Sequence, residues 1–347
     1  MGSSSSHRLD WVDYAKGICI VAVVMMYAAR DLHQELGQLG RALPPANWLD
    51  ELVEFARPFR MPDFFLISGL FLARVIDRPW RAYLDKKVVH YLYFFVLWSA
   101  IIFAVRSAAQ SFDRIDALAL EFLRWMVEPY AMLWFIQLLA VFFVFTKLTR
   151  RVPTWAMLAF GAGLFISEFR SPIHQLQNFG ERFVFFYAGY AFAPWFFKLV
   201  AWVQTHRGAA VVGLIAWAAV NGVAVGQGWS HEPVVALALG LAGACAVISI
   251  SGLLSLVPWM GWLRYLGQQS LVVYVGFYIP LAAMTRWLVS SGWPVFNGWG
   301  GLAITAFGIL AALCLYWAVR GTWLRWLFKR PAWAHLDRER PAAVVAS

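Results

Sequence analysis

Long apolar runs recur along the whole chain and are separated by short polar segments. A helix that crosses a bilayer needs about 20 mostly apolar residues, with a range of roughly 17–25. Ten segments have this pattern, namely residues 12–30, 59–77, 88–106, 130–147, 153–169, 182–199, 208–227, 233–257, 262–285 and 299–319. The pattern predicts an all-α integral membrane protein, a bundle of about ten transmembrane helices.

The first segment is the least obvious of the ten. Its uncharged stretch, Gly17 to Ala29, has only 13 residues, a length that also fits a buried helix. Lys16 and Arg30 border this stretch, and long cationic side chains extend their charges to the membrane surface. Tyr27 follows Lys16 by eleven residues, nearly three helical turns, so both lie on one face about 16 Å apart. Lys and Tyr are also common interface anchors, which explains the pair without any chemistry.

The composition agrees with a membrane protein. Hydrophobic residues make up 61% of the chain and charged residues only 14%, whereas average soluble domains carry about 25% charged residues. The 28 Phe and 20 Trp exclude a disordered chain, and the three cysteines are too few for a disulfide scaffold. These cysteines lie within apolar segments without the spacing of metal ligands, so we expect no metal.

The net charge of +10 is explained by topology. With ten spans, 19 of the 29 Lys and Arg fall on the side of the N-terminus, every lysine among them. The positive-inside rule therefore predicts that both termini are cytoplasmic, where anionic lipid attracts cations. No nucleic-acid partner is needed. The ten cations on the other side are Arg30, Arg41, Arg57, Arg60, Arg106, Arg114, Arg124, Arg170, Arg182 and Arg286.

Polar residues gather in residues 31–58 and at the start of the second apolar segment. Long polar loops between short ones are often functional, although an amphipathic cap lying on the membrane explains this loop equally well. At the start of the next helix, Asp63 is favoured by the helix dipole, whereas Arg57 and Arg60 are not. Arg60 therefore needs a carboxylate, a carbonyl group or a bound anion. Farther along, Ser68-Gly69 predicts a close contact between helices.

Few other polar residues lie at membrane depth, and Gln137 and Arg182 stand out. Intramembrane polar groups usually face the interior of a bundle or a cavity. For Gln137 an interhelical hydrogen bond is the simpler explanation. The candidate substrate-binding residues are Lys16, Arg30, Arg57, Arg60, Asp63, Ser68, Gln137 and Arg182.

Four short motifs follow one another along the chain. They are Asp13-Tyr14-Ala15-Lys16-Gly17-Ile18, Arg60-Met61-Pro62-Asp63-Phe64-Phe65-Leu66-Ile67-Ser68-Gly69, Leu133-Trp134-Phe135, and Leu266-Gly267-Gln268-Gln269-Ser270-Leu271-Val272-Val273-Tyr274. Together, from about residue 9 to 320, they resemble the membrane acyltransferase family 3. The resemblance implies transfer of an acyl group, often acetyl or succinyl, from cytoplasmic acyl-CoA to a hydroxyl of a cell-envelope carbohydrate or another small acceptor.

The chain departs from the family pattern where a base is expected. The resemblance implies that the first span carries an Arg and, after ten further residues, a catalytic His. Here Lys16 occupies the Arg position and Tyr27 the His position. The resemblance also leads us to expect a second His shortly after Tyr274, but this position holds Phe277. Free histidine titrates near neutral pH, whereas free tyrosine has a pKa near 10 and is a poor base at pH 7. The chain thus has the family's pattern without its expected base.

We predict that His33 replaces the missing base. It follows Tyr27 by six residues, and Asp31 or Glu35 could orient it. The candidate catalytic residues are therefore His33, Tyr27 and Asp31, while His90 and His174 are alternatives. At the cytoplasmic side, the phosphates of the donor would be attracted by Lys16, Arg78, Arg81, Lys86 and Lys87.

Two functions stay open. The first is an active membrane acyltransferase, with acyl-CoA as donor and the lipid bilayer as its surroundings, in a bacterial inner membrane. The second is a non-catalytic accessory or binding subunit with a protein partner, because both expected histidines are missing. A transporter is disfavoured, since intramembrane carboxylates are nearly absent. The predicted division is a disordered start or cloning remnant over 1–8, the transmembrane domain over 9–320, and a basic cytoplasmic tail over 321–347.

Overall fold

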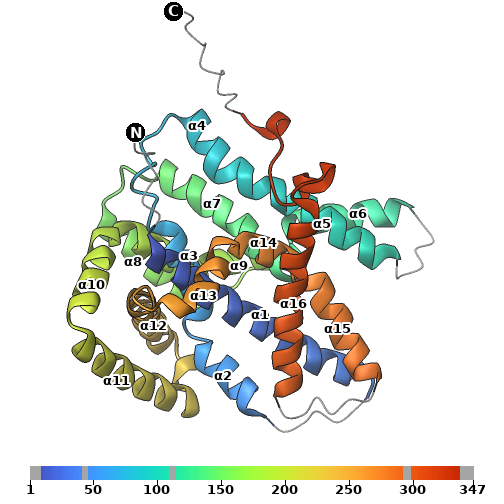
Figure 1. Cartoon of the computed structure of the whole chain (residues 1–347). Helices are drawn as coiled ribbons and strands as arrows, with labels where there is room; N and C mark the ends of the chain where they lie inside the picture. Colours follow the sequence, from blue (N-terminus) through green and yellow to red (C-terminus); the bar gives the residue numbers. More distant parts are fainter. Residues whose placement is uncertain (1–8, 41–45, 109–114, 292–297, 337–347) are drawn as a thin grey trace, which may run out of the picture.

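The computed structural model describes residues 9–40, 46–108, 115–291 and 298–336, which form helices and no β-strand (Figure 1). The start at 1–8, the end of the tail from 337, Arg41 and Arg114 lie outside the described residues. The α-helices are α1 (Asp10–Gln38), α2 (Trp48–Ala56), α3 (Arg60–Gly69), α4 (Trp80–Leu84), α5 (His90–Ala108), α6 (Ile115–Val127), α7 (Trp134–Leu148), α8 (Thr154–Ile166), α9 (His174–Ala191), α10 (Ala193–Thr205), α11 (Arg207–Gly226), α12 (Pro233–Leu254), α13 (Gly261–Gln268), α14 (Ser270–Gly276), α15 (Tyr278–Ser290) and α16 (Trp299–Val319). Shorter turns are the π-helix η1 (Asp85–Val89) and the 3-10 helices η2 (Ala131–Leu133), η3 (Trp229–His231), η4 (Pro258–Met260), η5 (Trp323–Leu327) and η6 (Ala332–Ala334).

The all-helical membrane architecture is confirmed, but not every predicted span has full length. Among the described residues, six helical stretches are long and apolar enough to cross a membrane. Two bent pairs, α9 with α10 (71°) and α14 with α15 (50°), raise the number to eight. The predicted spans at 59–77 and 153–169 contain only α3, with 10 residues, and α8, with 13. A 10-residue helix is about 15 Å long, which is half of the hydrocarbon thickness. α3 is this short because it ends at Gly69, after which the chain continues in turns.

The least obvious segment of the sequence forms the central helix. α1 has 29 residues, and 72% of its most apolar window is buried inside the protein, compared with 17% for α11. It packs against α3, α12, α13, α15 and α16, which surround it in Figure 1. A helix buried on nearly all sides can tolerate few charges, whereas α11 presents apolar residues to lipid.

Glycines allow the helices to approach closely, as Ser68-Gly69 predicted. A Cβ atom on Gly69 would clash with the carbonyl oxygen of Phe186, and one on Gly189 would clash with that of Leu66. These two contacts join α3 and α9. Gly267 on α13 lies equally close to the carbonyl of Asp13 on α1. Small residues at such crossings are typical of helix packing in membranes.

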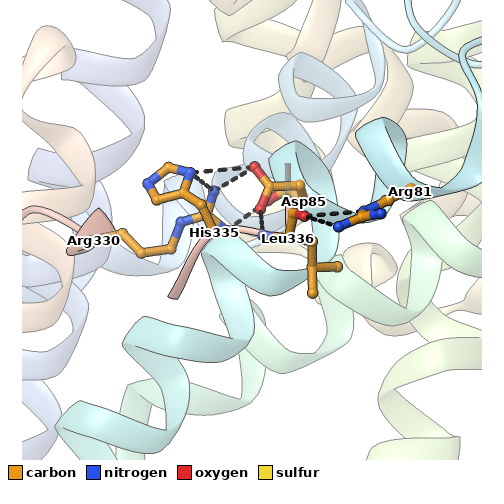
Figure 2. A network of polar contacts seen from close by, with 5 residues as sticks. All are labelled: Arg81, Asp85, Arg330, His335 and Leu336. Carbon is orange, nitrogen blue, oxygen red and sulfur yellow. Dashed lines mark hydrogen bonds and ion pairs between the residues drawn. The ribbon is translucent and has the colours of Figure 1, made fainter. Parts of the chain in front are cut away.

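A buried ion pair fastens the C-terminal segment to η1, between α4 and α5 (Figure 2). Arg330 donates to the Asp85 carboxylate and to the Asp85 carbonyl oxygen, both at 2.7 Å. The same carboxylate accepts from the Leu336 backbone N–H at 2.6 Å and lies 3.4 Å from His335. Arg81 donates to the Leu336 carbonyl at 2.8 and 3.0 Å. We call these five residues the C-terminal clamp.

Candidate functional site

Four cavities meet at the end of α1 that carries Tyr27 and Arg30. The first, here the arginine cavity, has a volume of about 560 Å³, and its cations are Arg30, Arg57, Arg60, Arg170 and Arg182. The second, here the tyrosine cavity, has about 520 Å³ and holds Asp31, Tyr130, His174 and Tyr278. The two adjoin, since both are lined by Tyr27, Arg30, Trp134 and Asn178. The third cavity, of about 560 Å³, is lined by His33, and the fourth, of about 480 Å³, is lined by Arg286.

The predicted sorting of the cations is reflected in these cavities. Of the ten arginines assigned to the side opposite the N-terminus, seven line one or another of the four: Arg30, Arg57, Arg60, Arg106, Arg170, Arg182 and Arg286. The segments that carry them therefore meet at one end of the bundle. Which end faces the cytoplasm stays a prediction.

Tyr27 stands where two helical elements from distant parts of the chain meet. It is 5% exposed, and its ring centre lies 5.5 Å from that of Phe277 and 6.4 Å from that of Tyr278. Phe277 lies at the bend between α14 and α15. The two positions where the family resemblance led us to expect histidine thus contact each other, and both hold aromatic rings.

The two candidate bases after Tyr27 lie on different faces of α1. Asp31 follows Tyr27 by four residues, so it shares a face with it and lines the tyrosine cavity. His33 follows by six residues, a rotation of about 240°, and lines the neighbouring cavity with Asp50 and Arg60. There its Nε2 lies 3.9 Å from the Asp50 carboxylate. His33 and Tyr27 therefore do not share a cavity wall among those described.

The tyrosine cavity contains groups that sequence reasoning missed. The Tyr278 hydroxyl donates to that of Tyr130 at 3.2 Å, and Arg106 donates to the same Tyr130 oxygen. The Tyr130 ring is stacked on Trp125 at 4.5 Å. His174, considered only as an alternative, also lines this cavity at the first residue of α9. In the sequence, only the Leu133-Trp134-Phe135 motif indicated this wall of the cavity, because its Trp134 is one of the lining residues.

The arginine cavity is held by contacts from several elements. Arg57 pairs with Glu54 at 3.0 Å and donates to Ser230 at 2.7 Å, while its third nitrogen lies 3.0 Å from His231. Arg60 has a different kind of partner, the Val53 carbonyl at 2.6 Å.

Two other arginines of this cavity differ in their pairing. Arg182 pairs with its neighbour Glu181 at 3.0 Å, and its Nε is buried without a hydrogen-bond partner. Arg30 makes no hydrogen bond or ion pair among the described residues.

Four of the eight predicted substrate-binding residues lie away from these cavities, namely Lys16, Asp63, Ser68 and Gln137. Asp63 is 1% exposed, and neither carboxylate oxygen has a hydrogen-bond partner among the described residues. Ser68 donates to the Phe64 carbonyl of its own helix at 2.7 Å. Gln137 donates to the Met126 carbonyl at 2.6 Å and accepts from Gln175, as the interhelical interpretation expects.

Lys16 lies at the other end of α1, within a basic cluster. Lys16 and Arg78 are close enough to Lys87 for the three charges to interact, although they come from three separate elements. Lys147, 3% exposed, donates to the carbonyl of Arg78 at 2.8 Å and to that of Ile76. This buried cation holds the turn that presents Arg78. Among the residues described, no group of three or more His, Cys, Asp or Glu could hold a metal.

A bundle of apolar helices with polar cavities at one end and a basic cluster at the other defines a multi-pass membrane protein with a substrate-sized site. The chain belongs to the acyltransferase 3 family, whose acyltransferase domain matches residues 9–321. It is also 30% identical over 166 residues to inner membrane protein YcfT of Escherichia coli strain K12, a match that covers 42% of this chain and 46% of that protein. The chain thus matches about half the length of this curated relative. No solved structure matches the chain.

Proposed function

We propose that the protein transfers an acyl group from acyl-CoA to a hydroxyl of a cell-envelope carbohydrate or another small acceptor. Family membership supports acyl transfer. The single observation that carries the site assignment is that Tyr27, which lines a polar cavity together with Asp31, packs against the buried Phe277. We place this cavity at the outer side of a bacterial inner membrane and both termini in the cytoplasm, following the positive-inside rule.

In the proposed reaction Asp31 is the general base in place of histidine. Its carboxylate accepts the proton of the acceptor hydroxyl, whose oxygen attacks the thioester carbonyl carbon. The new C–O bond forms, the C–S bond breaks, and CoA leaves as a thiolate. Tyr27 keeps its proton and donates a hydrogen bond to the oxyanion that develops on the carbonyl oxygen. Asp31 is preferred to His33 because it shares a face of α1 and a cavity wall with Tyr27.

The donor would enter from the end that carries the basic cluster. Lys16, Arg78 and Lys87 supply positive charge for the CoA phosphates, and Arg81 and Lys86 are near them in sequence. α1 connects this cluster to Tyr27 over about 16 Å. The pantetheine arm of the donor would follow α1 from one end to the other.

The test uses purified protein in nanodiscs with radiolabelled acetyl-CoA and an envelope fraction. We expect label to reach the acceptor, Asp31→Asn to lower the rate at least 100-fold, and the exposed, matched carboxylate variant Glu51→Gln to leave it unchanged. Loss of transfer in His33→Ala with full activity in Asp31→Asn would make His33 the base. Absence of any thioester turnover would refute acyl transfer.

A second candidate, a non-catalytic subunit of a membrane assembly, is favoured by the aromatic pair at both expected histidine positions. Extraction in mild detergent followed by mass analysis distinguishes it. A stoichiometric partner together with no thioester turnover would support the subunit, and a strictly monomeric protein would refute it.

A further inference from the structure

The arginine cavity carries more positive charge than the structure neutralises. Its lining contains five arginines but only two carboxylates, Glu168 and Glu181. Topology does not explain this surplus, because the positive-inside rule favours cations on the side of the basic cluster. The adjoining tyrosine cavity is different, since Asp31 and Glu128 there offset Arg30. Of these two cavities, only the arginine cavity therefore has a surplus of positive charge.

Arg60 has no carboxylate of its own as a partner among the described residues. Its one hydrogen bond goes to a neutral group, the Val53 carbonyl. Arg57 and Arg182 are close enough to Arg60 for the like charges to repel one another. Glu54 also lies within electrostatic range, but it is ion-paired with Arg57 and its side chain is 54% exposed. Arg60 moreover begins α3, whose dipole adds positive potential at this point.

Clustered, half-buried guanidinium groups are typical of sites that bind carboxylate or phosphate, because their planar N–H groups match those oxygens. Arg182 has one carboxylate neighbour, Glu181, and its buried Nε has no hydrogen-bond partner among the described residues. Neutral polar side chains complete the wall, namely Gln177, Asn178 and Ser230. These can bind hydroxyl groups, and Trp134 offers an aromatic face to a sugar ring.

We propose that the arginine cavity binds an anionic group of the acceptor, so that the acceptor is a saccharide carrying a carboxylate or a phosphate. The inference rests on the proposed acyl transfer for the role of this ligand. Arg60 and Tyr27 both line the arginine cavity, and Tyr27 lines the tyrosine cavity as well. An anion held by Arg57, Arg60 and Arg182 therefore places a hydroxyl of the same molecule at Tyr27 and Asp31. The arginines act as binding and specificity groups, not as the base.

The first experiment measures binding without catalysis. Protein in nanodiscs is titrated with methyl glucoside, methyl glucuronide and glucose 6-phosphate, and tryptophan fluorescence gives each Kd. We expect the two anions to bind at least tenfold more tightly than the neutral sugar. Arg60→Gln and Arg182→Gln should remove this preference, Arg60→Lys should restore part of it, and the exposed control Arg124→Gln should leave it unchanged. Melting temperatures verify that each variant is folded.

The second experiment distinguishes the two sources of an anion. Transfer rates are compared for acetyl-CoA and succinyl-CoA with each sugar. A preference for charged acceptors that depends on Arg60 supports the inference. An Arg60-dependent preference for succinyl-CoA alone overturns it, because the anion would then belong to the acyl group. Equal binding of neutral and charged sugars also overturns it, even if acyl transfer occurs, whereas selective binding without any transfer refutes only the proposed function.

Discussion

Replacement of Asp85 by alanine should release the C-terminal clamp. The side chains of Asp85 and Arg330 are only 3% and 5% exposed, and their nitrogen and oxygen atoms are 2.7 Å apart. The substitution would remove the carboxylate that also accepts from the Leu336 N–H and would leave the buried Arg330 guanidinium with two neutral partners, the residue 85 carbonyl and the His335 ring. Removal of one partner from a buried ion pair costs about 3–5 kcal/mol. We expect a loss of this size in the free energy of unfolding.

The chain offers a matched control in Asp77. It pairs with Arg150 at 3.4 Å, but the two side chains are 86% and 41% exposed. Exposed pairs contribute about 0–1 kcal/mol, because water already solvates both charges. Asp77→Ala should therefore be nearly neutral.

The assay is unfolding in detergent micelles, followed by tryptophan fluorescence, for both variants and the parent protein. Limited trypsin digestion adds a local measurement, since Asp85→Ala should expose the bond after Lys329 to cleavage, whereas the bond after Arg330 resists trypsin because Pro331 follows it. Equal unfolding free energies for Asp85→Ala and Asp77→Ala, with unchanged cleavage, would refute the reasoning from burial.

Three further changes test the site and the packing. Tyr27→Phe keeps the ring contacts but removes the proposed oxyanion donor, so kcat should fall about 100- to 1000-fold with an unchanged melting temperature. Equal kcat values would exclude that role. Gln137→Leu leaves the Met126 carbonyl without its donor, so stability should fall by about 1–3 kcal/mol while the KM of the acceptor stays constant; a raised KM with normal stability would instead support substrate binding. Gly267→Ala should lower unfolding free energy by about 1–3 kcal/mol through overpacking, whereas Gly213→Ala, with open space around it, should not; denaturant titration of the pair decides this.

The sequence predicted the apolar helices well but not their breaks. Hydropathy measures composition, so it located α3 and α8 while overestimating their lengths. It also grouped together the seven arginines that line the cavities at one end of the bundle, while the side of the membrane on which they lie stays a prediction. Tyr27 and Phe277 were singled out from two separate motifs, but only tertiary packing shows that the two positions meet.

The base assignment depended on helical rotation. Six residues separate Tyr27 from His33, and that spacing alone turns the imidazole away from the phenol once α1 continues unbroken to Gln38. The predicted first segment ended at residue 30, whereas α1 carries His33 as part of the same helix. The walls formed by Tyr130 and His174 left almost no signal, since each comes from a different element and neither spacing nor composition links them.

The unbroken length of α1 has a consequence for how the protein can change. One unbroken helix carries both Lys16 and Tyr27, so the proposed donor-binding charge and the proposed reaction centre are held at a fixed spacing and a fixed angle. Insertion of a single residue between them would turn Tyr27 by about 100° out of the cavity wall while moving it only about 1.5 Å along the axis. Insertions of one or two residues there should thus abolish activity because they rotate Tyr27 about the helix axis, and not because they change its distance from Lys16. The register of α1 is the constraint that relatives of this protein would have to keep.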